Sequence, residues 1–281
     1  MRSGDLKETV AMAMLLLVVC VGAQAQQKQT MRAYFEDLNA KAAAGQPLPP
    51  FDQELFMGTG TVPLAEIVDA APAIRVALAH DATVKYGAGM LVGFALRPDT
   101  DAVLRESRLA MEGVLAKGSA SSKLLCLPYL RLVQIDRIDE GAPVLEAYLQ
   151  GPEAAGRSGG GACFAQVLLS ISPIPADADA AVAKFIRRRD LDSGSLADMT
   201  NVVANTHASS PEVVKATVEL IHDARVNQYF VQEIHRQPPA VRDGVRQELT
   251  RTLQDEKTTE DSRAEAKRFL DQIDAANGNG K

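Results

Sequence analysis

Tryptophan is absent from this chain, and aromatic residues make up only 5% of it. β-Sheets are enriched in aromatic and β-branched side chains, whereas Ala, Leu and Val dominate here. This balance disfavours β-sandwiches and barrels and predicts an all-α protein. At 281 residues, the chain is long enough for one elongated domain or two compact ones.

An excess of positive charge is also lacking. The chain has 30 Lys and Arg against 36 Asp and Glu, which gives a net charge of -6. Nucleic-acid-binding surfaces need clustered basic residues to neutralise phosphates. We therefore expect no nucleic-acid partner.

Residues that carry chemistry are few and widely spaced. The histidines are His80, His207, His222 and His235, and none lies in a HExxH or other compact metal-binding spacing. No Gly-x-Ser-x-Gly or Ser-x-x-Lys motif presents a nucleophile. The glycine-rich run 156–161 lacks the Lys-Ser/Thr ending of a phosphate-binding loop, so it is interpreted as a flexible connector. We expect no catalytic, cofactor-binding or metal-binding residues.

The first twenty-five residues have the pattern of a signal peptide. Arg2 and Lys7 precede an apolar run over Val10–Val21, and the small residues Ala23 and Ala25 then precede a cleavage site between Ala25 and Gln26. This pattern predicts an exported protein, either periplasmic or secreted.

A membrane anchor is the alternative to cleavage. The run Val10–Val21 is shorter than the ~20 apolar residues that a spanning helix needs, so the mature chain is expected to have no membrane span. Cys20 raises lipidation as another alternative, but Val19 before it is larger than the small residue that such sites prefer. A lipid anchor is therefore less favoured than release.

Two cysteines follow the leader, Cys126 and Cys163. In an oxidising compartment an even pair favours a disulfide. Both cysteines have apolar neighbours, and a buried free thiol behaves as a small hydrophobic side chain. The sequence leaves both alternatives open.

Beyond the leader, the sequence predicts a series of helices separated by helix-stopping residues. An N-terminal helix and a Pro/Gly-rich connector are expected over residues 26–62. Two helical halves then follow, over 63–150 and 162–276, with the glycine-rich loop 151–161 between them and a disordered tail over 277–281.

Three places within this series are less regular. Pro72 is expected to open a second helical turn through Ala79, and Pro128 is expected to kink or break the run that ends at Ile138. The segment Gly161–Ile171 fits either a helix or a short strand.

Two helices resemble the second helix of a HEAT-type repeat. That pattern has an acidic cap, an apolar-basic pair, and then small and apolar core positions. DATVKYGAGMLV over Asp81–Val92 matches it best, and DSRAEAKRFL over Asp261–Leu270 is similar with the cap displaced by one position. Looser matches begin at Ser210 and Val241, whereas the resemblance fades between Ser119 and Ser209, so about half of the mature chain carries it.

This resemblance implies an α-solenoid, in which paired helices stack and present an extended binding surface. A non-enzymatic, exported interaction module whose partner is another protein is the leading hypothesis. The alternatives are an exported enzyme, such as a hydrolase, with a site assembled from distant residues, and a binder of an unknown small molecule.

The cluster Arg187, Arg188 and Arg189 closes a predicted helix and is followed by Asp190 and Asp192. Basic residues in a last turn complement the helix dipole. The cluster is therefore interpreted as a solvated helix end, with an interaction patch for an acidic partner or lipid headgroups as the functional alternative.

Overall fold

The computed structural model describes residues 29–50, 58–119, 121–136, 140–156, 160–171, 175, 177–206 and 208–278. Within these ranges every regular element is a helix, which confirms the all-α prediction. The leader and its cleavage site, Ala25 and Gln26, lie outside them.

The α-helices range in length from 6 residues in α13 to 19 residues in α15. They are α2 (Met31–Ala43), α4 (Leu64–Ala79), α5 (Val84–Ala95), α6 (Asp101–Lys117), α7 (Cys126–Asp136), α8 (Ala142–Gln150), α9 (Gly161–Ser170), α10 (Ala178–Ile186), α11 (Ser193–Thr206), α12 (Pro211–Glu219), α13 (Asn227–Gln232), α14 (Pro239–Gln254) and α15 (Glu260–Gly278). Short 3-10 helices cover Gly58–Thr61, Pro98–Thr100, Ser122–Leu125, Pro152–Ala155, Leu220–His222 and Ile234–Arg236.

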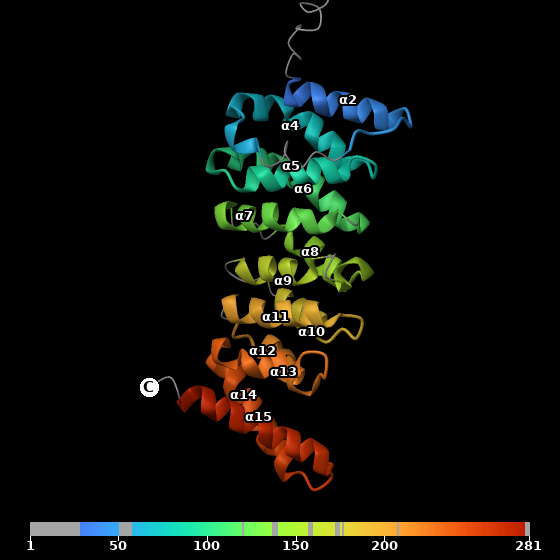
Figure 1. Ribbon diagram of the computed structural model, residues 1–281. Coiled ribbons are helices and arrows are strands. Elements are labelled where there is room, and N and C mark those ends of the chain that lie inside the picture. The colour runs from blue at the N-terminus through green and yellow to red at the C-terminus, as the bar shows by residue number, and fades with distance from the viewer. Residues whose placement is uncertain are drawn as a thin grey trace, which may run out of the picture.

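The helices form an elongated stack in which α2 packs on α4 and, from α4 onward, each α-helix packs on its second neighbour along the chain (Figure 1). One column of contacts runs α2, α4, α6, α8, α10, α12 and α14, and the other runs α5, α7, α9, α11, α13 and α15. Consecutive helices, such as α4 with α5 and α8 with α9, join the two columns. Each helix thus buries an apolar stripe both against the other column and against the layers above and below.

Three arginines form hydrogen bonds between layers, and in each case the donor and the acceptor are separated by a similar number of residues. The Arg97, Arg188 and Arg225 side chains each donate to backbone carbonyls of the preceding layer, between 34 and 39 residues earlier in the chain. Each of these guanidinium groups also forms two hydrogen bonds to an aspartate two residues away. The same arrangement, an arginine that binds both a nearby aspartate and the carbonyls of the preceding layer, therefore occurs at three levels of the stack.

The core is continuous along the whole stack. Its buried hydrophobic side chains extend from Met31 in α2 to Ile273 in α15. Ala154 and Phe164, on either side of the glycine-rich segment, both belong to it. Packing therefore does not break where the sequence predicts a boundary between two halves.

The structure gives a different outcome at each of the three irregular places in the sequence. Pro72 lies inside one continuous helix, α4, and its ring is exposed. Pro128 lies in the first turn of α7, where a missing N–H costs no helical bond, so the chain starts a helix there instead of kinking one. The segment Gly161–Ser170 is a helix, and the alternative strand is wrong.

Candidate functional site

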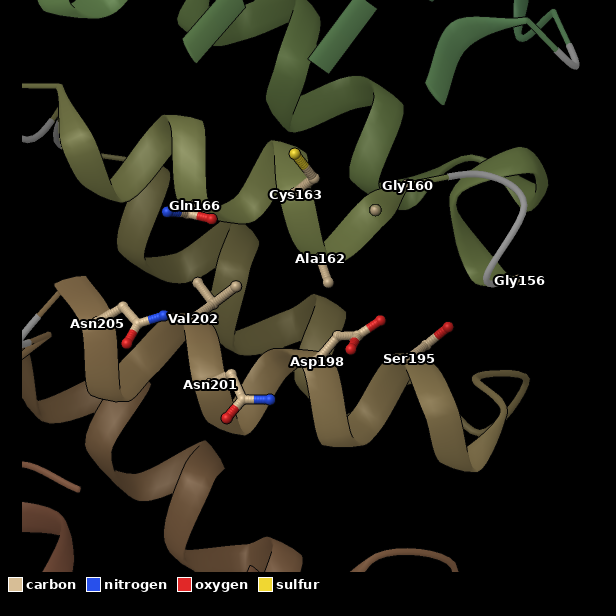
Figure 2. Close-up of a pocket in the computed structure, with 11 residues that line it drawn as sticks. Gly156, Gly160, Ala162, Cys163, Gln166, Ser195, Asp198, Asn201, Val202 and Asn205 are labelled. Carbon is tan, nitrogen blue, oxygen red and sulfur yellow. The ribbon is translucent and has the colours of Figure 1, made fainter. Parts of the chain in front are cut away.

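A groove of about 360 Å³, lined by both polar and apolar groups, lies between α9 and α11 (Figure 2). Its walls come from these two helices and from the glycines that precede α9. The lining residues are Gly156, Gly160, Gly161, Ala162, Cys163, Gln166, Ser195, Asp198, Asn201, Val202 and Asn205.

The α11 wall follows from helical periodicity. Ser195, Asp198, Asn201 and Asn205 are three or four residues apart, so they share one face of the helix. Asp198 and Asn205 are exposed, whereas Ser195 is buried. The result is a row of hydrogen-bonding groups along one edge of the groove.

The opposite wall is provided by α9. Ala162 points toward α11, while Cys163 points away from it (Figure 2). Gln166 is half-buried one turn further along and offers both an amide donor and an acceptor. Ala162 and Val202 are buried and apolar, so the groove combines an apolar floor with polar edges.

One edge residue is held in place from the next layer. The Asn201 Nδ2 atom donates to the Tyr229 hydroxyl at 3.0 Å, and that hydroxyl lies 3.3 Å from Asn201 Oδ1. Tyr229 belongs to α13, which packs beneath α11. The hydrogen bonds to Tyr229 therefore fix the orientation of the Asn201 amide without any ligand.

A disulfide lies beside this groove. Cys126, the first residue of α7, is bonded to Cys163 in α9, and their Cα atoms are 6.1 Å apart. The bond links two successive layers of one column. It anchors the first turn of α9, where the groove begins.

The three consecutive arginines do not act as one group. Arg187 binds Glu219 on α12 through two hydrogen bonds, of 2.6 and 3.0 Å, and these lower the pKa of Glu219. Arg188 binds Asp190 and the carbonyls of the preceding layer, and its hydrogen bonds lower the pKa of Asp190. Of these three arginines, Arg189 is the one whose guanidinium forms no hydrogen bond or ion pair with the described residues. The interaction patch stays a prediction, with Arg189 as its free member.

Replacing Arg188 with alanine is expected to lower the free energy of unfolding by about 2–3 kcal/mol, because hydrogen bonds from a charged donor are lost. The side chain is only 13% exposed and donates to the carbonyls of Leu149 and Gly151 at 2.7 and 2.6 Å. Urea unfolding followed by circular dichroism measures the change. Arg189→Ala is the matched control and should stay within about 0.5 kcal/mol of the wild type. Equal effects of the two substitutions would contradict this assignment.

A second hollow, of about 470 Å³, lies between α6 and α8. Its lining is mainly apolar and includes Leu115, Pro143, Val144 and Ala147. It lacks the ordered row of polar groups that distinguishes the groove beside α11.

The histidines stay apart in the structure. His80 ends α4, and His222 lies 3.1 Å from Glu248 through its Nε2 atom. His235 is exposed after α13, and His207 lies outside the described residues. Over the described ranges, no three metal-binding side chains gather at one point. None of the helices described combines the length and the apolarity needed to cross a membrane.

Sequence reasoning missed the groove. Its only signal is the polar stripe of α11, Asp198, Asn201 and Asn205, which is the expected pattern of any solvent-facing helix edge. The apposition of Gln166, from a helix about 35 residues earlier, depends on how the layers stack. No motif spacing connects these residues.

No family model matches this chain, and neither the curated proteins nor the solved structures that were searched contain a match.

Proposed function

We propose that this protein is an exported, non-enzymatic helical-repeat scaffold of the α-solenoid type that binds another protein along the groove between α9 and α11. The observation that carries the proposal is the second-neighbour packing of the helices, together with three arginine side chains that each donate to backbone carbonyls 34 to 39 residues earlier in the chain. Stacked units of this kind expose long surfaces whose residues come from successive layers.

The character of the groove supports a binding role. Amide and hydroxyl groups line its edges, and the apolar floor of Ala162 and Val202 lies between them. Binding surfaces commonly combine a buried apolar centre with a hydrogen-bonding rim. The HEAT-like pattern of Asp81–Val92 agrees with the same class of protein.

Two observations support export. The leader has a charged start, an apolar centre and a small-residue cleavage site before Gln26. The disulfide between Cys126 and Cys163 requires an oxidising environment to persist, such as the periplasm or the exterior. The proposed location is therefore periplasmic or extracellular.

Site-specific photo-crosslinking tests the binding role. A benzophenone amino acid at Ser170, which is exposed at the end of α9, is expected to yield a protein adduct in the envelope or the culture fluid. The same group at Lys184, exposed on α10 in the other column, serves as the matched control. Equal labelling from both positions, or no adduct from Ser170, would refute a partner at this groove.

A small-molecule binder is the second candidate, because about 360 Å³ lies within the size range of ligand pockets. A ligand-dependent rise in melting temperature during a thermal-shift screen would favour it. The hydrolase alternative predicts turnover by the purified protein that one substitution in the groove abolishes.

A further inference from the structure

The groove beside α11 carries hydrogen-bonding capacity that the protein itself does not use. Within the described part of the chain, the side chains of Gln166, Asp198 and Asn205 make no hydrogen bond or ion pair. Each amide offers donors and an acceptor, and the carboxylate offers acceptors only. The three groups lie on both edges of the groove and face the space between α9 and α11 (Figure 2).

The dimensions of the groove match a short extended segment. Ser195 and Asn205 mark its ends along α11. At a rise of 1.5 Å per helical residue they are about 15 Å apart along the helix axis. An extended chain advances about 3.3 Å per residue, so four to five peptide residues span roughly this length.

The arrangement of the groups suits a polypeptide backbone. A peptide in extended conformation presents carbonyl and N–H groups along its edges, and side-chain amides complement both. Its side chains alternate between two faces, so every second one meets the floor formed by Ala162 and Val202. That floor favours small apolar side chains at alternate positions.

Charge complementarity at the groove edge predicts a basic side chain in the bound peptide. Asp198 is a negative group at the groove edge with no cationic partner among the described residues, and the whole chain carries a net charge of -6. A Lys or Arg of the ligand supplies the missing positive charge. The lining contains no aromatic side chain on which a nucleic-acid base stacks, so a single-stranded nucleic acid fits the groove poorly.

From these observations we infer that the groove binds an extended peptide of four to five residues, held through its backbone by Gln166 and Asn205 and through one Lys or Arg by Asp198. The inference rests on the proposed function, since it names the part of the protein partner that the scaffold recognises. The bound segment is an unstructured tail or loop of that partner.

Panning a phage-displayed library of random heptapeptides on the full-length protein tests this inference. The enriched peptides are expected to share one Lys or Arg next to a small apolar residue. Fluorescence polarisation with the best enriched peptide then gives the dissociation constant. Asp198→Asn is expected to weaken its binding roughly tenfold, as for a charge pair within an interface. It should not alter the binding of the same peptide with methionine in place of its Lys or Arg.

The backbone contacts are tested separately. The Gln166→Leu/Asn205→Leu double variant is expected to weaken both peptides to a similar extent, because it removes contacts that do not depend on the peptide sequence. Asp243→Asn and Gln247→Leu, both on the exposed surface of α14, are the matched controls and should change neither constant. Circular dichroism and melting temperature establish that each variant is folded.

Several results would overturn the inference. These are a selection that enriches no peptide, enriched peptides without a basic residue, or affinities that the groove variants leave unchanged. A crosslinked partner at Ser170 together with a failed selection would retain the scaffold function and reject the extended peptide. Failure of the crosslinking with a successful selection would instead place peptide binding outside a scaffold role.

Discussion

Replacing both Cys126 and Cys163 with alanine is expected to lower the free energy of unfolding by about 4 kcal/mol, because the bond closes a long loop in the unfolded chain. The two cysteines are 37 residues apart in the sequence and connect α7 to α9 across successive layers. For a chain of this size, such a loss lowers Tm by roughly 10 °C. Differential scanning calorimetry of the oxidised protein and the double variant measures it.

Reduction provides the matched control for this prediction. Dithiothreitol should lower the Tm of the wild type and leave the Tm of the double variant unchanged. Alkylation of the unfolded, unreduced protein followed by peptide mapping should leave Cys126 and Cys163 unlabelled. Two labelled cysteines, or a wild-type Tm that is insensitive to dithiothreitol, would show that the pair is not bonded in solution.

Gly161→Ala is expected to lower the free energy of unfolding by about 3 kcal/mol, since an added methyl group in a packed core forces its neighbours to move. A Cβ atom at Gly161 would overlap the Phe185 ring and would lie 2.5 Å from the carbonyl oxygen of Ala154. The Phe185 side chain is fully buried and the carbonyl belongs to the backbone, so neither has room to retreat. Urea unfolding monitored by circular dichroism measures the loss.

The control for Gly161→Ala is the same substitution in open space. Gly113 lies within α6, and a Cβ atom there has no neighbour within 4 Å. Gly113→Ala should therefore stabilise the protein by about 0.5–1 kcal/mol through helix propensity alone. Similar losses at the two positions would contradict the close approach of α9 to Phe185. A fall in peptide affinity for Gly161→Ala is also expected, because α9 forms one wall of the groove.

Where helix-stopping residues are clear, the sequence predicts the end of a helix. The first helical half is expected to end at Gln150, before the glycine-rich loop, and α8 ends at the same residue. The run that ends at Ile138 was less predictable, because proline can kink a helix, break it, or occupy its first turn, and Pro128 alone does not decide among these. The choice depends on Ser122–Leu125, which forms a separate 3-10 helix before α7.

The segment at α9 shows why short apolar runs remain ambiguous. The sequence Gly161–Ser170 is apolar almost throughout and has no clear periodicity, so it fits a buried helix or a buried strand. Its neighbours α7 and α11 are helices on either side of it in the stack. The segment 161–170 is a helix because a helix packs against α7 and α11, and that surrounding structure is not visible in the local sequence.

The arginines illustrate a different limit. The sequence does not distinguish the three consecutive arginines, Arg187, Arg188 and Arg189, because each contributes the same positive charge. Their roles differ because Arg188 faces the carbonyls of the preceding layer, whereas Arg187 faces Glu219 on α12. These partners are 32 to 39 residues away, beyond the reach of a local pattern.

The sequence by itself determined the all-α class and the end of the first helical half at Gln150, because caps, prolines and apolar stripes act within a few residues. The tertiary structure alone decided which helices stack, how the arginines are used and where the groove lies. The groove joins Gln166 of α9 to Asp198 and Asn205 of α11, and these residues meet only because second-neighbour helices pack against each other. Contacts of that kind depend on the shape of whole helix faces, which no single motif in the sequence records.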